Sequence, residues 1–310
     1  MKTIVVAAVQ AAPVYLDLAR SLEKLETLVR EAAATGAQLI CFGETWLAGY
    51  PAWLDYCPGA ALWDNHDVKE VFARLRENSV AVPGVETDLL CRLASELSVT
   101  IVVGVNERLD AGPGNGTLYN SLLTFTPDGR LANHHRKLVP TFSERMVWGQ
   151  GDARGLKTEP TPDFRVGGLI CWEHWMPLAR QAMHNAGEDV HIAVWPTVHE
   201  LHQLASRHYA FEGRCFVIAV GLIMRASDLP LAYDSAKVHS SGLVERGGSA
   251  IYGPDGTCIA GPVFDTEKIL TAELDLSRIA EERMTLDVTG HYSRPDVFSF
   301  ELRNKVRNQE

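Results

Sequence analysis

The sequence lacks any apolar run that approaches the ~18 residues needed to cross a membrane as a helix. It also lacks an excess of basic residues: its 310 residues carry a net charge of −10, which argues against a nucleic-acid partner. Its six cysteines are scattered without paired spacing, which suits a reducing compartment better than a disulfide framework. We therefore expect a cytoplasmic enzyme with no membrane and no nucleic-acid partner.

Composition favours one large folded unit. With 46% hydrophobic and 22% charged residues, the chain can bury a sizeable core, and we expect a single domain over residues 1–310. Residues 1–14 combine a lysine with a short apolar stretch, as a signal peptide does. Because Asp17, Arg20 and a helical pattern continue directly from it, we interpret this stretch as the first strand of the fold.

Strand-like and helical patterns alternate along the chain, as in βαβ units. Helices are predicted at 17–35, 67–77, 85–97, 177–186 and 200–212, and strands at 3–10, 37–42, 99–105, 189–195 and 214–222. Two pairs of segments without an intervening helix predict antiparallel hairpins across Pro-Asp-Gly turns: 118–126 with 131–137, and 247–253 with 257–274. The order indicates an α/β protein with a layered sheet.

Cys171 stands between a predicted strand and a helix. The segment 164–170 is short, apolar and contains glycine, whereas 177–186 has helical periodicity. A thiol at a strand-to-helix turn is offered to substrate, and the unpaired N–H groups that follow it would stabilise a thiolate. Free cysteines are commonly small buried hydrophobic residues, so the position by itself only nominates a nucleophile.

Two further polar residues end apolar strands. Glu44 follows the run at 37–42, and Lys137 closes a strand that begins near Leu131 and leads into a Pro-containing loop. In open α/β sheets the carboxyl ends of strands face the crevice where ligands bind. Each residue alone would commonly be solvated or salt-bridged. Together with Cys171 they form a candidate catalytic set.

These three residues lie in motifs that resemble the nitrilase superfamily of carbon–nitrogen hydrolases, which carries a Glu-Lys-Cys triad in this order. The motifs are FGETWLAGYP around Glu44, HRKLVPT around Lys137 and GGLICWEHWMP around Cys171. The resemblance extends over nearly the whole chain through GVNER, LYNS, ERMVWGQGD, GGSAIYGPDG and GHYSRPDVF. It implies a four-layer α-β-β-α sandwich, which becomes eight-layered when two subunits pack through their helical faces.

The residues after the cysteine, Trp172-Glu173-His174, resemble true nitrilases and the related cyanide-degrading enzymes. Glu144 matches the second glutamate that family members place beside the catalytic lysine. The resemblance thus implies hydrolysis of a small organic nitrile by water to the carboxylic acid and ammonia. A cyanide-degrading enzyme or an amidase with the same triad is the alternative, and a non-catalytic scaffold is the interpretation from another class.

Side-chain chemistry agrees with the resemblance. A nitrile carbon is a modest electrophile, so attack needs a soft nucleophile such as the Cys171 thiol, once a base has taken its proton. Glu44 is the candidate base, because burial raises the pKa of a carboxylate and a nearby ammonium lowers it. Lys137 would stabilise charge that develops on the nitrile nitrogen, and Glu144 would hold Lys137 in position.

The substrate pocket is harder to assign. The candidates, chosen for their place next to the catalytic set, are Trp172, Thr141, Trp195 and Pro196. Aromatic residues are more often ordinary core, so these positions are expectations about an apolar pocket. The class of nitrile depends on a few side chains in loops, which the sequence does not fix. His291 lies in the GHYSRPDVF motif, which resembles the family's own, and we assign it no role.

We expect no metal and no cofactor. His199 and His202 stand in HELH, which lacks the i, i+4 pairing of HExxH, so these histidines are expected on a helix face or a pocket rim. The glycine-rich segment 112–116 follows no strand-to-helix phosphate pattern and is expected to be a loop.

Two segments interrupt the alternating pattern, one at about 50–67 and one at about 225–247. The resemblance implies insertions near such places, which help nitrilases to build helical or spiral oligomers. Loops that cover the pocket are the alternative. We expect a homo-oligomer, a dimer or larger.

Overall fold

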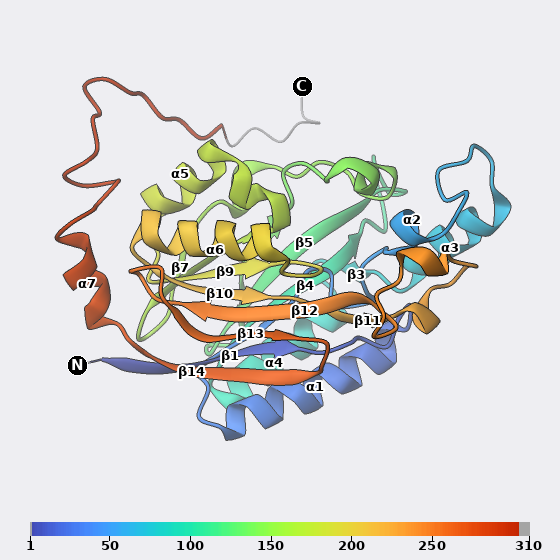
Figure 1. The fold of residues 1–310 in the computed structure, drawn as a ribbon, viewed down its shortest axis with the longest axis horizontal. Helices are drawn as coiled ribbons and strands as arrows, with labels where there is room; N and C mark the ends of the chain where they lie inside the picture. Colours follow the sequence, from blue (N-terminus) through green and yellow to red (C-terminus); the bar gives the residue numbers. More distant parts are fainter. Residues whose placement is uncertain (1, 304–310) are drawn as a thin grey trace.

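Two mixed β-sheets pack face to face between layers of helices (Figure 1). The computed structural model describes residues 2–303. Helices α5 (Pro177–Ala186) and α6 (Glu200–Gly213) cover one side, and α1 (Leu18–Ala34) and α4 (Val85–Leu97) cover the other. The predicted four-layer α-β-β-α arrangement is confirmed. The remaining α-helices of the described residues are α2 (Trp53–Tyr56), α3 (His66–Glu77) and α7 (Ser277–Arg283).

Each sheet has seven strands. The first contains β1 (Thr3–Gln10), β2 (Leu39–Phe42), β3 (Val80–Ala81), β4 (Thr100–Arg108), β5 (Leu118–Thr126), β6 (Arg130–Arg136) and β14 (Lys268–Asp275). Its order is β14-β1-β2-β4-β5-β6, with β3 beside β4. The second contains β7 (Glu159–Pro160), β8 (Arg165–Ile170), β9 (Val190–Val194), β10 (Phe216–Val220), β11 (Ile223–Arg225), β12 (Leu243–Tyr252) and β13 (Cys258–Phe264). Its order is β11-β12-β10-β9-β8-β7, with β13 beside β12.

The core lies on both faces of each sheet. Val6 and Ala8 of β1 belong to the cluster between the two sheets, whereas Ala7 and Val9 belong to the cluster under the helices. Because both faces of the inner strands are covered, their sequences are continuous apolar runs without polar alternation. Helix α1 begins where the Asp17 side chain accepts a hydrogen bond from the main-chain N–H of Arg20.

One predicted hairpin is wrong in its second half. The segment 257–274 was expected to be a single partner of 247–253, but only β13 pairs with β12. The chain turns at Asp265, which has a φ of +63°, and β14 then joins β1 in the other sheet. The polar run at 265–268 marks the turn in the sequence, but local patterning does not specify which sheet the next strand joins.

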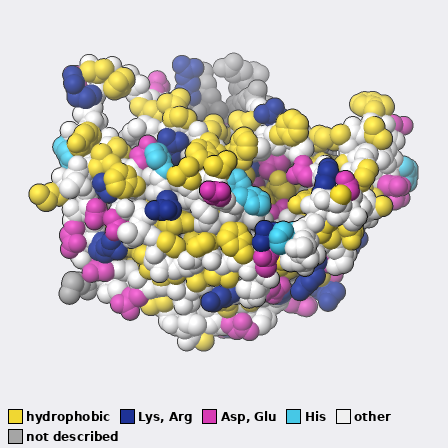
Figure 2. Space-filling model, viewed as in Figure 1, with side chains coloured by type: hydrophobic (Ala, Val, Ile, Leu, Met, Phe, Trp, Pro, Cys, Tyr) yellow, Lys and Arg dark blue, Asp and Glu magenta, His cyan; other side chains and the backbone are white. Residues whose placement is uncertain are grey.

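Three further features concern the membrane, the cysteines and the apolar surface of the protein. None of the helices within residues 2–303 is both long and apolar enough to span a membrane. All six cysteines are free thiols. Hydrophobic side chains gather over α5 and α6 on the face shown in Figure 2, where Leu178, Leu201 and Leu204 are exposed. The expected homo-oligomer stays a prediction.

Candidate active site

Three loops that follow β2, β6 and β8 bring Glu44, Lys137 and Cys171 together. The three residues are buried, with 0%, 1% and 4% of their surface exposed. Glu44 and Lys137 follow strands of the first sheet, and Cys171 follows a strand of the second, so the set lies where the two sheets meet. Residues far apart in the sequence thus form one cluster, as the strand-end argument predicted.

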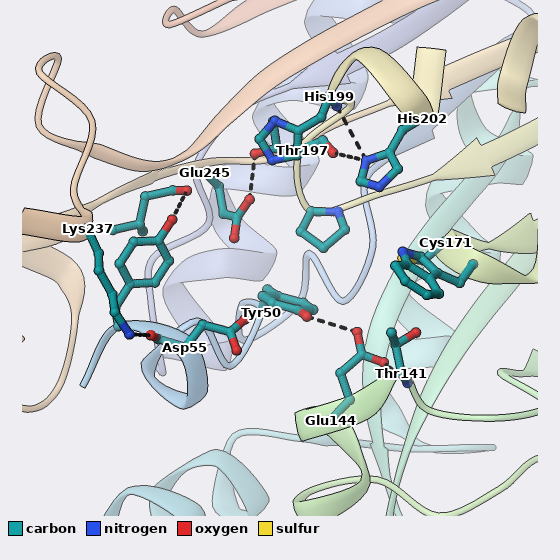
Figure 3. Close-up of a pocket in the computed structure, with 14 residues that line it drawn as sticks. Tyr50, Asp55, Thr141, Glu144, Cys171, Thr197, His199, His202, Lys237 and Glu245 are labelled. Atoms are coloured by element: carbon teal, nitrogen blue, oxygen red, sulfur yellow. Dashed lines mark hydrogen bonds between the residues drawn. The ribbon is translucent and has the colours of Figure 1, made fainter. Parts of the chain in front are cut away.

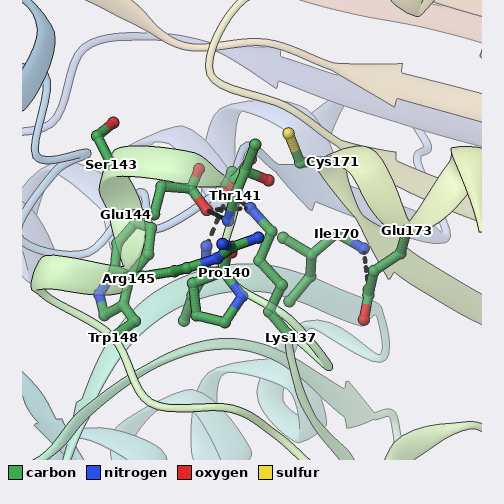
Figure 4. A network of polar contacts seen from close by, with 12 residues as sticks. Lys137, Pro140, Thr141, Ser143, Glu144, Arg145, Trp148, Ile170, Cys171 and Glu173 are labelled. Atoms are coloured by element: carbon green, nitrogen blue, oxygen red, sulfur yellow. Dashed lines mark hydrogen bonds and ion pairs between the residues drawn. The ribbon is translucent and has the colours of Figure 1, made fainter.

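Lys137 is held between two carboxylates. Its Nζ donates to Oε1 of Glu44 at 2.9 Å. It also donates to Oε2 of Glu144 at 2.7 Å (Figure 4). Glu144 lies in the short 3₁₀ helix η1 (Phe142–Met146), and its carboxylate also accepts from the Thr141 N–H at 2.6 Å and the Tyr50 hydroxyl at 2.8 Å. An ammonium has three N–H groups, so one remains for a ligand.

Glu44 keeps one oxygen available. Oε1 accepts from Lys137 and from Nδ2 of Asn120 at 2.7 Å, while Oε2 has no hydrogen-bond partner among residues 2–303. The reactive atoms of Glu44, Glu144 and Cys171 all lie within 4.8 Å of one another. The Glu44 loop packs so closely on β4 that a Cβ at Gly104 would clash with the main chain of residues 43 to 45. The absence of a side chain at Gly104 therefore allows the loop that contains Glu44 to lie against β4.

The Cys171 backbone is strained and firmly held. Its φ of +53° lies in the left-handed region, which is uncommon for residues other than glycine, and it begins the 3₁₀ helix η3 (Cys171–Trp175). The buried Glu173 carboxylate accepts from the Ile170 N–H at 2.7 Å and the Leu138 N–H at 2.8 Å. It also bonds Nε2 of His135 at 2.9 Å. Glu173 therefore fixes the residue before Cys171 and the residue after Lys137.

Burial and the interactions between neighbouring ionisable groups together set the pKa values of Glu44, Cys171 and Lys137. Burial raises the pKa of Glu44 to about 7 against the opposing effect of Lys137. Burial and the nearby Glu44 also raise the pKa of the Cys171 thiol well above its usual value. Burial alone would lower the pKa of Lys137, but the negative charge that Cys171, Glu44 and Glu144 can carry raises it. The resting site thus contains a thiol, an ammonium and a carboxyl group poised to accept a proton.

A second buried network supports Cys171 from behind. Nδ1 of His174 donates to the Cys171 carbonyl oxygen at 2.7 Å, so in the neutral ring Nε2 accepts from Nε2 of His191 at 2.9 Å. Nδ1 of His191 must then accept from Glu188, whose Oε1 lies 2.7 Å away, while the Tyr209 hydroxyl donates to Oε2 at 2.5 Å. This chain of donors requires a protonated Glu188. Burial raises the pKa of Glu188 to about 7.

A cavity of about 370 Å³ opens in front of the thiol (Figure 3). It appears in Figure 2 as a hollow between α6 and the region of α2, with acidic side chains inside it. Its lining residues are Tyr50, Asp55, Tyr56, Thr141, Glu144, Cys171, Trp172, Pro196, Thr197, His199, His202, Lys237, Val244 and Glu245. The lining mixes apolar and hydrogen-bonding groups, so it differs from the apolar pocket that the sequence suggested.

Three of the four expected pocket residues lie on the cavity wall, and one does not. Thr141, Trp172 and Pro196 line the cavity, with Trp172 half exposed at its entrance. Trp195 is fully buried behind the wall, because its ring stacks between His174 at 4.9 Å and His202 at 4.4 Å. This placement corrects the expectation for Trp195.

Sequence reasoning missed several wall residues. Asp55 and Tyr56 come from the first interrupting segment, and Lys237, Val244 and Glu245 come from the second. Both segments therefore contribute to the cavity, as the pocket-loop alternative proposed. The accumulation of Tyr, Trp and Asp in the first segment was the available signal. His199 and His202 lie on the cavity wall, as the pocket-rim interpretation of HELH expected.

The residue types and spacing of the site resemble those of a cation site. Glu44, Glu144 and Cys171 are near enough to one another to share an ion. However, the Lys137 ammonium already contacts both carboxylates and supplies the positive charge that a metal would bring.

Comparison with known proteins identifies the family. The family model described as Carbon-nitrogen hydrolase matches residues 5–284. The chain belongs to the carbon-nitrogen hydrolase family. This hydrolase is 41% identical over 301 residues to "Nitrilase 2" of an unknown prokaryotic organism, covering 96% of this chain and 92% of that protein. It is also 41% identical to "Aliphatic nitrilase" of Sinorhizobium fredii (strain HH103), covering 94% and 93%.

Further similarities of this carbon-nitrogen hydrolase are lower in identity but cover as much of the chain. It is 36% identical to "Bifunctional nitrilase/nitrile hydratase NIT4A" of Lupinus angustifolius, covering 99% of this chain and 88% of that protein. Its fold matches Saccharomyces cerevisiae Nit3, a member of branch 10 of the nitrilase superfamily, with a TM-score of 0.71 at 22% identity. That match covers 94% of this chain and 97% of Nit3. The chain is thus a hydrolase of the nitrilase family that acts on carbon–nitrogen bonds other than peptide bonds.

Proposed function

We propose that the protein hydrolyses an organic nitrile to the carboxylic acid and ammonia. One observation carries the proposal: the Cys171 thiol lies within 4.8 Å of two carboxylates that share a buried ammonium. A thiol, a base and a fixed cation are the groups that addition to a carbon–nitrogen triple bond requires. The relatives named nitrilase support a nitrile as the substrate.

In the first step, the free Oε2 of Glu44 accepts the thiol proton while Sγ of Cys171 bonds to the nitrile carbon. One π bond of the nitrile breaks, and its electron pair moves to nitrogen, where the third N–H of Lys137 stabilises it. Glu44 then returns the proton to that nitrogen. The product is a thioimidate, with Cys171 covalently bound and all protons accounted for.

Two water molecules complete the reaction. The first adds to the thioimidate carbon with Glu44 as base, and nitrogen leaves as ammonia after Glu44 protonates it, which gives a thioester. The second attacks the thioester, releases the carboxylic acid and restores the thiol. The raised pKa of Glu44 suits both accepting and returning protons near neutral pH. Loss of the thiolate before ammonia would release the amide instead, the outcome that the name of the lupin relative suggests for that protein.

The test is ammonia, acid and amide release from aromatic, arylacetic and aliphatic nitriles, cyanide and matching amides. Wild type should hydrolyse organic nitriles, and Cys171→Ala should lower turnover by at least ~10³-fold. Cys258→Ala is the matched control, because Cys258 is an exposed thiol that does not line the cavity. Near-normal activity in purified Cys171→Ala would overturn the mechanism. Activity on amides or cyanide alone would reassign the substrate.

A further inference from the structure

The cavity contains a carboxyl group for which the reaction has no use. Glu245, from β12, is 6% exposed and lies across the cavity from Cys171 (Figure 3). The triad and Glu144 account for proton transfer and charge balance at the thiol, and none of the hydrogen bonds of that cluster involves Glu245. A buried carboxyl group that chemistry does not need is a candidate for substrate recognition.

Hydrogen bonds fix one oxygen of Glu245 and leave the other available. The Arg246 N–H donates to Oγ1 of Thr197 at 2.8 Å, so the single hydroxyl proton of Thr197 is directed to Oε2 of Glu245 at 2.5 Å. Among residues 2–303, no side chain or main-chain group donates to Oε1. An unpaired carboxyl oxygen at a cavity wall is costly unless water or a ligand supplies a donor.

The cavity lining also offers few cations that could bind an anion. Three carboxyl groups, those of Asp55, Glu144 and Glu245, line it. Lys237 is the only lysine or arginine among the described lining residues, and its Nζ donates to the Asp55 main-chain oxygen at 2.9 Å. Burial lowers the pKa of His199 and His202, so both rings are neutral near pH 7. The wall is therefore rich in acceptors and poor in cations.

We propose that Glu245 is a specificity-determining residue that binds a hydrogen-bond donor, a hydroxyl or an ammonium group, at the end of the substrate remote from the nitrile carbon. This inference rests on the proposed nitrile hydrolysis and narrows its substrate class. Nitriles with a terminal donor are preferred over alkyl nitriles of the same shape, and nitriles with a terminal carboxylate are the poorest substrates.

The ionisation of Glu245 is compatible with both donors. Burial raises its pKa to about 8, against the hydrogen bond from Thr197, while Glu44 and Asp55 raise it further. Near pH 7 the carboxyl group is therefore mostly neutral, and because Oε2 accepts from Thr197 its proton lies on Oε1. A substrate hydroxyl can accept from this O–H and can also donate to the carboxyl group. An ammonium ligand would stabilise the carboxylate form and form the stronger, charge-assisted bond.

The first experiment compares kcat/KM of wild type on a matched series: an alkyl nitrile, its isosteric hydroxy analogue, the ω-amino nitrile and the ω-carboxylate nitrile. Each is measured at several methylene chain lengths. The hydroxy and amino compounds should exceed the alkyl compound by at least about tenfold at the best chain length, the expected effect of one buried hydrogen bond to a carboxyl group. Equal or better activity on the alkyl compound at every length would overturn the inference.

Two substitutions then assign the preference to Glu245. In Glu245→Leu both preferences should fall at least about tenfold, whereas Glu245→Gln should retain the hydroxyl preference and lose most of the ammonium preference. The readout is a ratio of substrates within one protein, so partial unfolding cancels. Glu200→Gln, an exposed charge change outside the cavity lining, is the control and should keep the wild-type ratios. Failure of wild type on every nitrile would reject the proposed function, while hydrolysis without preference would reject only this inference.

Discussion

The Glu173 carboxylate accepts a 2.8 Å hydrogen bond from the main-chain N–H of Leu138, and thereby ties the loop of the nucleophile to the loop of the lysine. Its other oxygen holds Ile170, the residue before Cys171. Burial would raise the pKa of Glu173, but His135 and the two N–H donors lower it overall. Glu173 is therefore a positioning residue that does not itself touch the cavity.

Glu173→Gln should lower both stability and turnover. An amide offers a single acceptor oxygen, so one of the two buried N–H groups would lose its partner, at a cost of about 1–3 kcal/mol in the free energy of unfolding. The displaced loops should lower kcat by about 10²-fold with a smaller effect on KM. Thermal unfolding and steady-state kinetics measure both effects, with Glu200→Gln as the control. Wild-type kcat would contradict the positioning role.

The pH dependence should report Glu44. With a folded-state pKa of about 7, Glu44 is protonated at acidic pH and unable to take the thiol proton. We expect kcat/KM to fall about tenfold per pH unit below pH 7 and to level off above it. The rate of Cys171 alkylation by iodoacetamide should follow the same curve, measured in a Cys258→Ala background. Burial also raises the pKa of Glu188 to about 7, so Glu188→Gln is the control. This variant should retain the wild-type dependence of kcat/KM on pH, which would show that Glu188 is not the group that titrates. A rise that continues to the thiol's own raised pKa would exclude Glu44 as the base.

Tyr50→Phe should weaken the support of Glu144. The substitution removes the hydroxyl that donates to Oε1 of Glu144 at 2.8 Å. Loss of one hydrogen bond to a charged group predicts about tenfold lower kcat/KM. The control is Tyr15→Phe, since the buried Tyr15 hydroxyl has no partner among residues 2–303. Equal activities of the two variants would show that Tyr50 contributes nothing through its hydroxyl.

Glu188→Gln should preserve the network behind Cys171 and improve stability at alkaline pH. Its amide can donate to His191 and accept from Tyr209, the pattern that a protonated Glu188 provides. Because the folded-state pKa of Glu188 is raised to about 7, its contribution to stability is fully present at low pH and is lost as pH rises from about 4.5 to 7. We expect Glu188→Gln to match wild type at pH 5 and to exceed it at pH 8 by roughly 3 kcal/mol. Denaturant unfolding at both values is the measurement. Destabilisation at both would instead indicate a charged His191 paired with an ionised Glu188.

Much of the framework is predictable because it depends on local patterns. The helices at 17–35 and 85–97 were predicted within a few residues of α1 and α4, since each has an apolar stripe at helical spacing. Polar residues at the ends of buried strands, Glu44, Lys137 and Cys171, indicated where the loops converge. These features need no knowledge of tertiary contacts.

The rest depends on contacts between distant segments. Trp195 and Pro196 are neighbours in the sequence, and only the stacking of His174 and His202 on Trp195 decides which of them faces the cavity. Glu245 precedes another charged residue, Arg246, in β12, and only its burial and the hydrogen bond from Thr197 place it on the cavity wall. Neither contact produces a hydrophobic periodicity that could be recognised in the sequence.

The pairing of β14 with β1 has a consequence for synthesis of the chain. Its register runs from Thr3 opposite Asp275 to Gln10 opposite Lys268, so the first sheet gains its outer strand only after nearly the whole polypeptide has been made. Closing so large a loop carries an entropic cost that local contacts cannot repay early in folding. We expect a nascent chain released before residue 268 to expose the edge of β1 to pairing with other chains, which makes truncated products prone to aggregation.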